Sequence, residues 1–221
     1  MLLSFGNIID PAINERVLIL HKALLQSPFD GFVESVPAYA SLAVFYDVRK
    51  IRRHESSSVF SYVKKHLQDL LEQGLQVNDL TTRLLKIPVC YDPDLGIDIT
   101  DVAKMRGLTI DQIISLHSAV IYRVYMIGFM PGFAYMGTVD GKIIAPRKER
   151  PRVLVPAGSV GIAGSQTGIY PFDSPGGWQI IGKTPLSLFD TRRADPCLLA
   201  AGDQVQFFSI DRNEFEQLHG H

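Results

Sequence analysis

The second half of the chain concentrates glycine and proline in a way that restricts the folds open to it. Of the 18 glycines, 11 fall between Gly128 and Gly182, and the run from Pro151 to Pro185 separates short apolar segments with glycine and proline. Glycine permits tight corners and also lets the backbone approach a ligand or another chain closely. Short strands between such turn residues are typical of a β-barrel. The run therefore predicts a closed sheet, with either barrel corners or a ligand site as the reason for its glycines.

The segment from Gly158 to Gly164 (GSVGIAG) resembles a phosphate-binding loop in composition but matches no standard nucleotide motif. It lacks the Gly-Lys-Ser/Thr ending of a P-loop and the Gly-x-Gly-x-x-Gly spacing of a dinucleotide site. Its successive backbone N–H groups would still suit an anion-binding concavity. The sequence also has no Gly-x-Ser-x-Gly elbow, no His-Glu-x-x-His motif and no cysteine-rich ligand set. A self-contained hydrolase is disfavoured, and no metal site is predicted.

The first part of the chain alternates helical and strand patterns. The expected elements are a strand over 2–5, a helix from 11 to about 26, strands over 32–37 and 41–46, a helix from 59 to 71, and a strand near 84–89. Asp10 and Pro11 supply an N-cap and a first helical proline, serines at 56–58 cap the second helix, and Gly74 ends it. We therefore expect a small α+β sandwich over residues 1–86, with two helices on one face of a sheet.

The pattern changes near residues 85–90, and we expect a second domain over residues 87–221. Two short helices are predicted there, one over 99–106 before Gly107 and one after the capping box at 109–112. The clearest strands beyond Ala119 are at 120–127, 152–156, 178–183 and 205–210. The predicted fold class is α+β, with a small sandwich followed by a β-barrel.

Composition and charge exclude several functional classes. The 221 residues are 46% hydrophobic and 20% charged, with a net charge of -1, as in soluble globular proteins. Nucleic acid is a poor candidate partner, because binding it usually needs a basic face. Cys90 and Cys197 match no metal or redox spacing and indicate reduced thiols in a cytoplasmic protein. No run is long enough to cross a membrane, and the apolar start lacks the basic region of a signal peptide.

Polar and aromatic side chains near the glycine-rich run are the candidates for chemistry. Arg147 and Arg152 suit a carboxylate or a phosphate because the guanidinium makes two parallel charge-assisted bonds, although solvated surface charge explains them as well. His117 has a pKa suited to proton transfer near neutrality, yet a lone histidine is more often structural. The aromatic residues Phe129, Phe133, Tyr135 and Trp178 either line an apolar pocket or pack in the core.

Long ordered blocks of the second half resemble one known family. They are Leu116-His117, 126–137 (MIGFMPGFAYMG), Pro146-Arg147, Pro151-Arg152, 155–164 (VPAGSVGIAG), 166–171 (QTGIYP), 174–178 (SPGGW) and 182–185 (GKTP), with a looser match at 36–39 and 46–47. The blocks are similar to those of the family of the 5-oxoprolinase B subunit (PxpB), also known as KipI or allophanate hydrolase subunit 1. The resemblance covers nearly the whole chain and implies a small N-terminal α/β domain followed by a cyclophilin-like β-barrel.

The resemblance implies a place in a multi-subunit enzyme. Such proteins act with a PxpC-like second cyclophilin-like subunit and a PxpA-like subunit to cleave 5-oxoproline to glutamate, with ATP as co-substrate of the complex. The expected role is one wall of a shared site, without activity of its own, in which glycine N–H groups stabilise oxyanion charge. The catalytic candidates are His117, Arg147 and Arg152. The substrate- or partner-binding candidates are Phe133, Tyr135, Gly158, Ser159, Gly161, Gln166, Tyr170, Gly176, Gly177, Trp178 and Lys183.

Two other functions stay open. Similar proteins inhibit a sporulation histidine kinase, and one exposed Gly/Pro-rich face would suit that partner as well as a substrate. A related domain pair also occurs in the carboxyltransferase part of urea carboxylase. The Met-Lys-Met motif of biotin attachment is absent from this sequence, so such an activity would require another protein.

Overall fold

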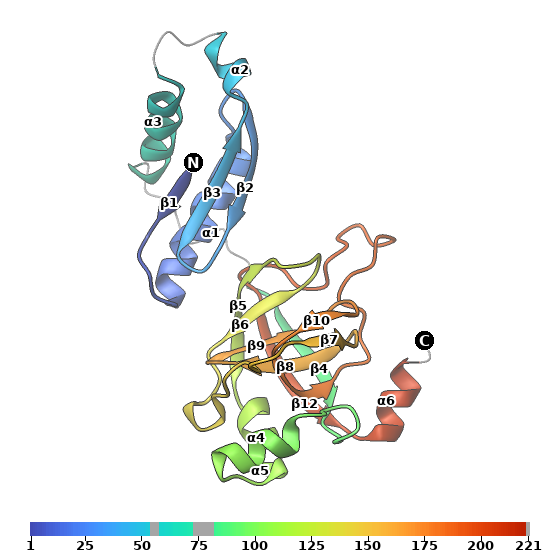
Figure 1. Ribbon diagram of the computed structural model, residues 1–221. Coiled ribbons are helices and arrows are strands. Elements are labelled where there is room, and N and C mark those ends of the chain that lie inside the picture. The colour runs from blue at the N-terminus through green and yellow to red at the C-terminus, as the bar shows by residue number, and fades with distance from the viewer. Residues whose placement is uncertain (54–57, 73–81, 220–221) are drawn as a thin grey trace. The chain divides into compact units, whose positions relative to one another are not determined.

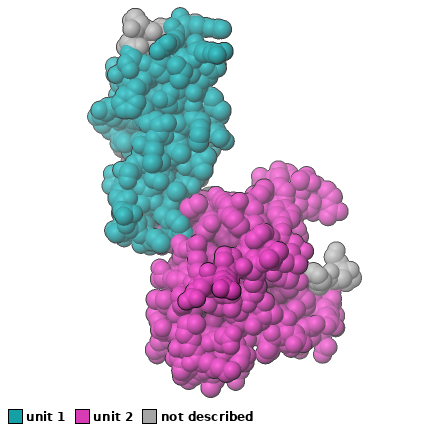
Figure 2. All heavy atoms as spheres, viewed as in Figure 1, with its two compact units in different colours: residues 1–81 teal, residues 82–221 magenta. Residues whose placement is uncertain are grey.

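The chain consists of two compact units, Met1–Thr81 and Thr82–His221, which Figure 2 shows in different colours. The computed structural model describes residues 1–53, 58–72 and 82–219. The α+β fold class predicted from the sequence is confirmed, since unit 1 combines helices with a small sheet and unit 2 contains a closed barrel (Figure 1).

Unit 1 is a three-stranded antiparallel sheet packed against helices. The strands are β1 (Leu2–Ser4), β2 (Phe32–Pro37) and β3 (Ser41–Tyr46) in the order β1-β3-β2, and the helices are α1 (Pro11–Gln26), α2 (Val48–Arg52) and α3 (Val59–Glu72). Leu42 and Val44 point to the same face of β3, because successive strand residues alternate. They pack in one apolar cluster with Val17, Leu20 and Leu24 of α1 and Val63, Leu67 and Leu70 of α3. Both helices therefore cover one face of the sheet, as predicted.

Local signals set the start of α1. Asp10 accepts a hydrogen bond from the backbone N–H of Ile13 at 2.9 Å, and Pro11 is the first helical residue. The expected stop of α3 at Gly74 lies outside the described residues, as do two of its three expected capping serines.

Unit 2 is built on a closed seven-stranded barrel. Its strands are β4 (Leu84–Cys90), β5 (Ile121–Ile127), β6 (Ala134–Gly137), β8 (Ser159–Ala163), β9 (Gln166–Ile169), β11 (Gln179–Lys183) and β12 (Gln204–Ile210). They follow the order β11-β4-β12-β5-β6-β9-β8, and β8 closes the ring by pairing with β11. A separate two-stranded sheet joins β7 (Arg152–Val155) to β10 (Ser174–Gly176).

The strand expected near 84–89 belongs to the barrel and not to the sandwich, which corrects the prediction. β4 pairs in parallel with β12 along its whole length, from Leu84 opposite Gln204 to Cys90 opposite Ile210. The boundary expected after residue 86 would cut this strand. Its apolar residues predict a strand, but nothing local identifies a partner that lies 120 positions away.

Three helices accompany the barrel: α4 (Ile99–Arg106), α5 (Ile110–Ser118) and α6 (Arg212–His219), the last not predicted from the sequence. A 3-10 turn, η2 (Gly141–Ile143), packs against α4 and α5, which lie together at one end of unit 2 (Figure 1). Thr109 and Gln112 form the predicted capping box, with each side chain accepting the other's backbone N–H. Across the described ranges, none of the helices combines the length and the apolar character needed to cross a membrane.

Candidate functional site

A pocket of about 270 Å³ opens on unit 2, and we call it the aromatic pocket. Its lining residues come from the loop after β5, from β6, from the segment before β7 and from β10 and its flanks. They are Phe129, Phe133, Tyr135, Arg147, Lys148, Pro151, Tyr170, Pro175, Gly176, Gly177 and Trp178. The pocket thus unites segments between Phe129 and Trp178 that are separated in sequence.

Phe133 is the centre of the aromatic wall. Its ring centroid lies 4.8 Å from that of Tyr135, 5.2 Å from that of Tyr170 and 5.5 Å from that of Trp178, in tilted and edge-to-face arrangements that aromatic rings prefer. Phe129 packs edge-on against Phe133 yet keeps 64% of its surface exposed. Its φ of 70° is unusual for a bulky residue and commonly marks a functional loop. The rings therefore form a fixed apolar surface with one exposed phenyl group.

Arg147 is the exposed cation of the pocket. Its guanidinium carbon lies 5.8 Å from the centroid of the Trp178 ring, in a cation–π contact that orients the side chain along the aromatic wall. Among the residues that the structure describes, no carboxylate forms an ion pair with it. A guanidinium held in this way is prepared to bind an anionic group of a ligand.

Asp98 anchors two further cations beside the pocket. Its carboxylate is 1% exposed, and Oδ1 pairs with the Lys148 ammonium at 2.8 Å and with the Arg152 guanidinium. Oδ2 accepts the backbone N–H of Ile180 at 2.7 Å. A buried carboxylate needs such partners, because desolvation of an unpaired charge is costly. Arg152, predicted as a catalytic candidate, is thus committed to Asp98 and does not line the pocket, whereas Lys148 does.

His117 lies in the interior of the barrel, away from the aromatic pocket. It is fully buried, and its ring stacks on Phe207 with centroids 4.6 Å apart. Nδ1 is 2.8 Å from the Tyr91 hydroxyl, and Nε2 is 3.0 Å from the hydroxyl of Thr167, which itself donates to the Gly161 carbonyl. Thr167 therefore accepts from Nε2–H, and Nδ1 accepts from Tyr91. Burial lowers the pKa of His117 to about 3, so its ring is neutral near pH 7 and favours a structural role.

The run from Gly158 to Gly164 forms a strand rather than an anion-binding concavity, which corrects the expectation for this segment. Ser159 and Gly161 belong to β8, whose residues are all buried and which has a neighbouring strand on each side, β9 and β11. The N–H of Gly158 donates to the Tyr170 carbonyl at 2.7 Å. These backbone groups serve the barrel, because a strand flanked on both sides uses its N–H groups in the sheet.

The structure brings half of the predicted site residues together. Those that line the aromatic pocket are Arg147, Phe133, Tyr135, Tyr170, Gly176, Gly177 and Trp178. Those elsewhere in unit 2 are His117, Arg152, Gly158, Ser159, Gly161, Gln166 in β9 and Lys183 in β11. Lys148 and Asp98 were not predicted. Lys148 follows Arg147 directly, and Asp98 precedes α4 without capping it through its side chain, but neither feature alone indicates a site.

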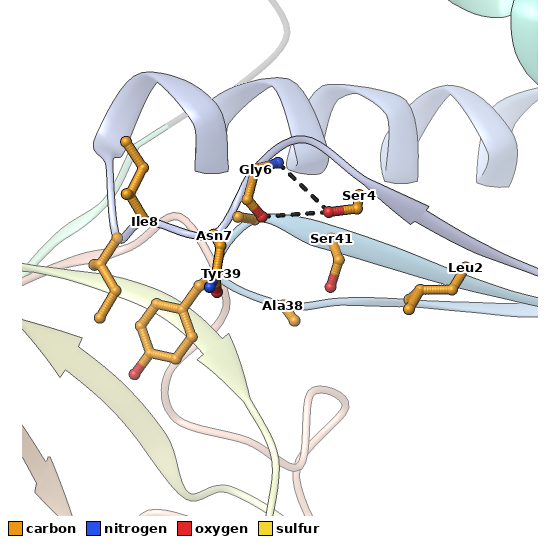
Figure 3. A pocket seen from close by; sticks show the side chains of 10 residues that line it. Leu2, Ser4, Gly6, Asn7, Ile8, Ala38, Tyr39 and Ser41 are labelled. Carbon is orange, nitrogen blue, oxygen red and sulfur yellow. Dashed lines mark hydrogen bonds between the residues drawn. The ribbon is translucent and has the colours of Figure 1, made fainter.

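Two other pockets are less suited to an anionic ligand. One, of about 380 Å³, lies in unit 1 and is lined by Leu2, Ser4, Gly6, Asn7, Ile8, Ile9, Ala38, Tyr39, Ala40 and Ser41, none of them charged. Figure 3 shows Leu2 at one end of it and Tyr39 and Ile8 at the other. The second, of about 540 Å³, lies beside α5 and β12 and has Lys86 as its one charged lining residue. Within the described ranges, no three histidine, cysteine or acidic side chains are grouped to hold a metal ion.

Comparison with known proteins assigns the class of this fold. The sequence model described as carboxyltransferase domain, subdomain C and D, matches residues 1–199. A crystal structure of TTHA0988 is similar with a TM-score of 0.82 and 38% identity, over 96% of this chain and 40% of that longer chain. The chain therefore belongs to the carboxyltransferase domain family, subdomain C and D.

Curated relatives narrow the assignment further. The chain is 43% identical to the 5-oxoprolinase B subunit of Bacillus subtilis (strain 168) over 218 residues, which cover 97% of this chain and 91% of that protein. It is 48% identical to the 5-oxoprolinase B subunit of Haemophilus influenzae over 196 residues, covering 87% and 86% of the two chains. The chain belongs to the family of 5-oxoprolinase B subunits, as its sequence blocks predicted.

Proposed function

We propose that this chain is a subunit of an ATP-dependent 5-oxoprolinase and supplies one wall of a site shared with PxpC-like and PxpA-like subunits. The observation that carries the proposal is the aromatic pocket, which combines a rigid apolar wall with the exposed guanidinium of Arg147. The two relatives named as 5-oxoprolinase B subunits share more than two fifths of its residues over most of the chain.

The pocket suits the chemistry of 5-oxoproline, a five-membered lactam that carries one carboxylate. The ring packs against the exposed Phe129 and the half-buried Tyr135, and the carboxylate binds Arg147 in two parallel charge-assisted bonds. The lactam is unstrained, so its cleavage needs an energy source. Transfer of the γ-phosphoryl group of ATP to the amide oxygen releases ADP. Water then adds to the activated carbon and the C–N bond breaks, which gives γ-glutamyl phosphate. A second water hydrolyses this acyl phosphate to glutamate and phosphate.

The described lining residues include neither a metal cluster nor a nucleophile paired with a base, which supports a shared site in preference to an autonomous one. The burial of His117 and the pairing of Arg152 with Asp98 favour Arg147 as the residue that touches substrate. ATP would bind elsewhere in the complex, because the segment 158–164 contains strand β8 and leaves no phosphate loop there.

A reconstituted complex tests the proposal. Arg147→Met, combined with PxpA-like and PxpC-like subunits, is expected to lower ATP-dependent release of glutamate by roughly 10- to 100-fold, the equivalent of one charge-assisted interaction. Arg150→Met is the matched control, since Arg150 is exposed in the same segment but does not line the pocket. Wild-type turnover by Arg147→Met would exclude the role of Arg147. Absence of ATP-dependent glutamate release from the wild-type complex would exclude the function.

The family description favours one alternative, a carboxyltransferase-like component. In that case, this chain and its partner subunits, mixed with a carboxylated biotin carrier protein and an acceptor molecule, would transfer the carboxyl group to the acceptor. The kinase-inhibitor role stays a prediction, and it requires that the purified chain suppress autophosphorylation of a sensor histidine kinase.

A further inference from the structure

We propose that the aromatic pocket prefers a ligand with two anionic groups on a short aliphatic linker, and so binds the phosphorylated ring-opened form, which carries a carboxylate and a phosphate, better than the lactam. The inference rests on the proposed function, because it names which species of that reaction this wall holds. It concerns Lys148, whose role is separate from that of Arg147.

The charge around the pocket is strongly positive. Arg147 and Lys148 line it, and no acidic side chain does. The adjacent carboxylate, Asp98, pairs with both Lys148 and Arg152. Three cations therefore accompany one carboxylate, which leaves two positive charges. A ligand with two negative charges matches this excess, whereas the single carboxylate of a lactam leaves one cation without an anionic partner.

The two tyrosines of the wall do not offset this charge. Burial raises the pKa of Tyr135 and that of Tyr170 above the usual value for a phenol. Both side chains are therefore neutral hydroxyl-bearing rings at physiological pH. They contribute apolar surface and hydrogen-bonding groups to the pocket, while the cations provide its charge.

The position of Lys148 allows its ammonium to leave Asp98 and to bind an anionic group of a ligand. Its side chain is 26% exposed, and its ammonium lies 2.8 Å from the Asp98 oxygen that Arg152 also contacts. If the ammonium turns to a ligand, Asp98 keeps Arg152 and the Ile180 N–H, so its buried charge is not left bare. Lysine suits this movement because its ammonium is a point charge on a flexible stem. The backbone of Lys148 stays fixed, since its N–H donates to the Gly177 carbonyl at 2.7 Å.

The pocket also has the right size and surface for such a molecule. A volume of about 270 Å³ admits a five-carbon dicarboxylate, and Phe129 and Tyr135 offer apolar surface to its methylene groups. A second charge-assisted contact contributes about 1.5–3 kcal/mol, which corresponds to roughly 10- to 100-fold in affinity.

Fluorescence of Trp178, the one tryptophan of the chain, reports binding at the pocket directly. The purified chain is titrated with glutarate as a dianion, 5-oxoproline as a monoanion and 2-pyrrolidone as a neutral lactam, and calorimetry provides a second measurement. Glutarate is expected to bind at least about 10-fold more tightly than 5-oxoproline. Lys148→Met should remove this difference while changing the affinity for 5-oxoproline little. Lys148→Arg should retain it.

Lys142→Met is the matched control, because Lys142 is an exposed lysine of η2 outside the pocket. The inference is wrong if 5-oxoproline binds as tightly as glutarate or more tightly. It is also wrong if the preference for glutarate persists in Lys148→Met, or if neither method detects binding of any ligand. The proposed function fails separately. If the complex hydrolyses 5-oxoproline but the chain does not prefer glutarate, only this inference is wrong. If the chain prefers glutarate but its complex lacks 5-oxoprolinase activity, only the proposed function is wrong.

Discussion

Asp98 and Ile180 bind each other through two hydrogen bonds. The N–H of Asp98 donates to the Ile180 carbonyl at 2.8 Å, and the N–H of Ile180 donates to Oδ2 of Asp98 at 2.7 Å. The pair joins the start of α4 to β11, while the other carboxylate oxygen holds Lys148 and Arg152. One buried residue thus connects a helix, the barrel and the cations beside the aromatic pocket.

Asp98→Ala is expected to destabilise unit 2 by about 3–5 kcal/mol, because it leaves two partly buried cations without their carboxylate. Urea unfolding followed by Trp178 fluorescence measures the loss. Asp101→Ala is the matched control: Asp101 lies in the first turn of the same helix but is exposed, so its removal should cost less than about 1 kcal/mol. Equal effects of the two substitutions would contradict the anchoring role of Asp98.

His117→Gln should flatten the dependence of stability on pH. The folded protein holds His117 neutral because burial lowers its pKa to about 3, whereas in the unfolded chain it takes up a proton below about pH 6.5. Its contribution is therefore complete above pH 6.5 and is lost as the pH falls toward 3. Between pH 7 and pH 5 the wild-type chain should lose about 2 kcal/mol more unfolding free energy than the variant. Parallel profiles from urea titrations at the two pH values would refute the buried neutral state.

Gly176→Ala should damage the aromatic pocket, whereas Gly177→Ala should be tolerated. A Cβ at Gly176 would lie 2.8 Å from Cζ of Tyr170, but one at Gly177 would meet nothing nearer than 3.7 Å. Overpacking of this kind costs about 1–3 kcal/mol and displaces the tyrosine ring. The measurements are urea unfolding and the Trp178 titration with glutarate. Equal behaviour of these neighbouring glycines would show that the Tyr170 contact does not shape the pocket.

The local sequence determined where several helices begin, which side chains carry suitable chemistry and which family the chain resembles. Asp10 and the box of Thr109 and Gln112 cap helices where predicted, since a side-chain cap bonds to a backbone group only two or three residues away. The aromatic residues and Arg147 were also identified, because their side-chain chemistry does not depend on context. The ordered motif blocks by themselves indicated the family.

Only the tertiary structure decided which of these groups act together. It paired β4 with β12 across 120 positions and placed the segment 158–164 in a strand with a neighbour on each side. It also buried His117 and paired Arg152 with a carboxylate 54 residues earlier. It also added Lys148 to the pocket. The physical reason is that strand pairing, burial and charge compensation arise between residues distant in sequence. A local pattern specifies a residue's own hydrogen bonds and faces, but it contains nothing about the partner that the fold brings to it.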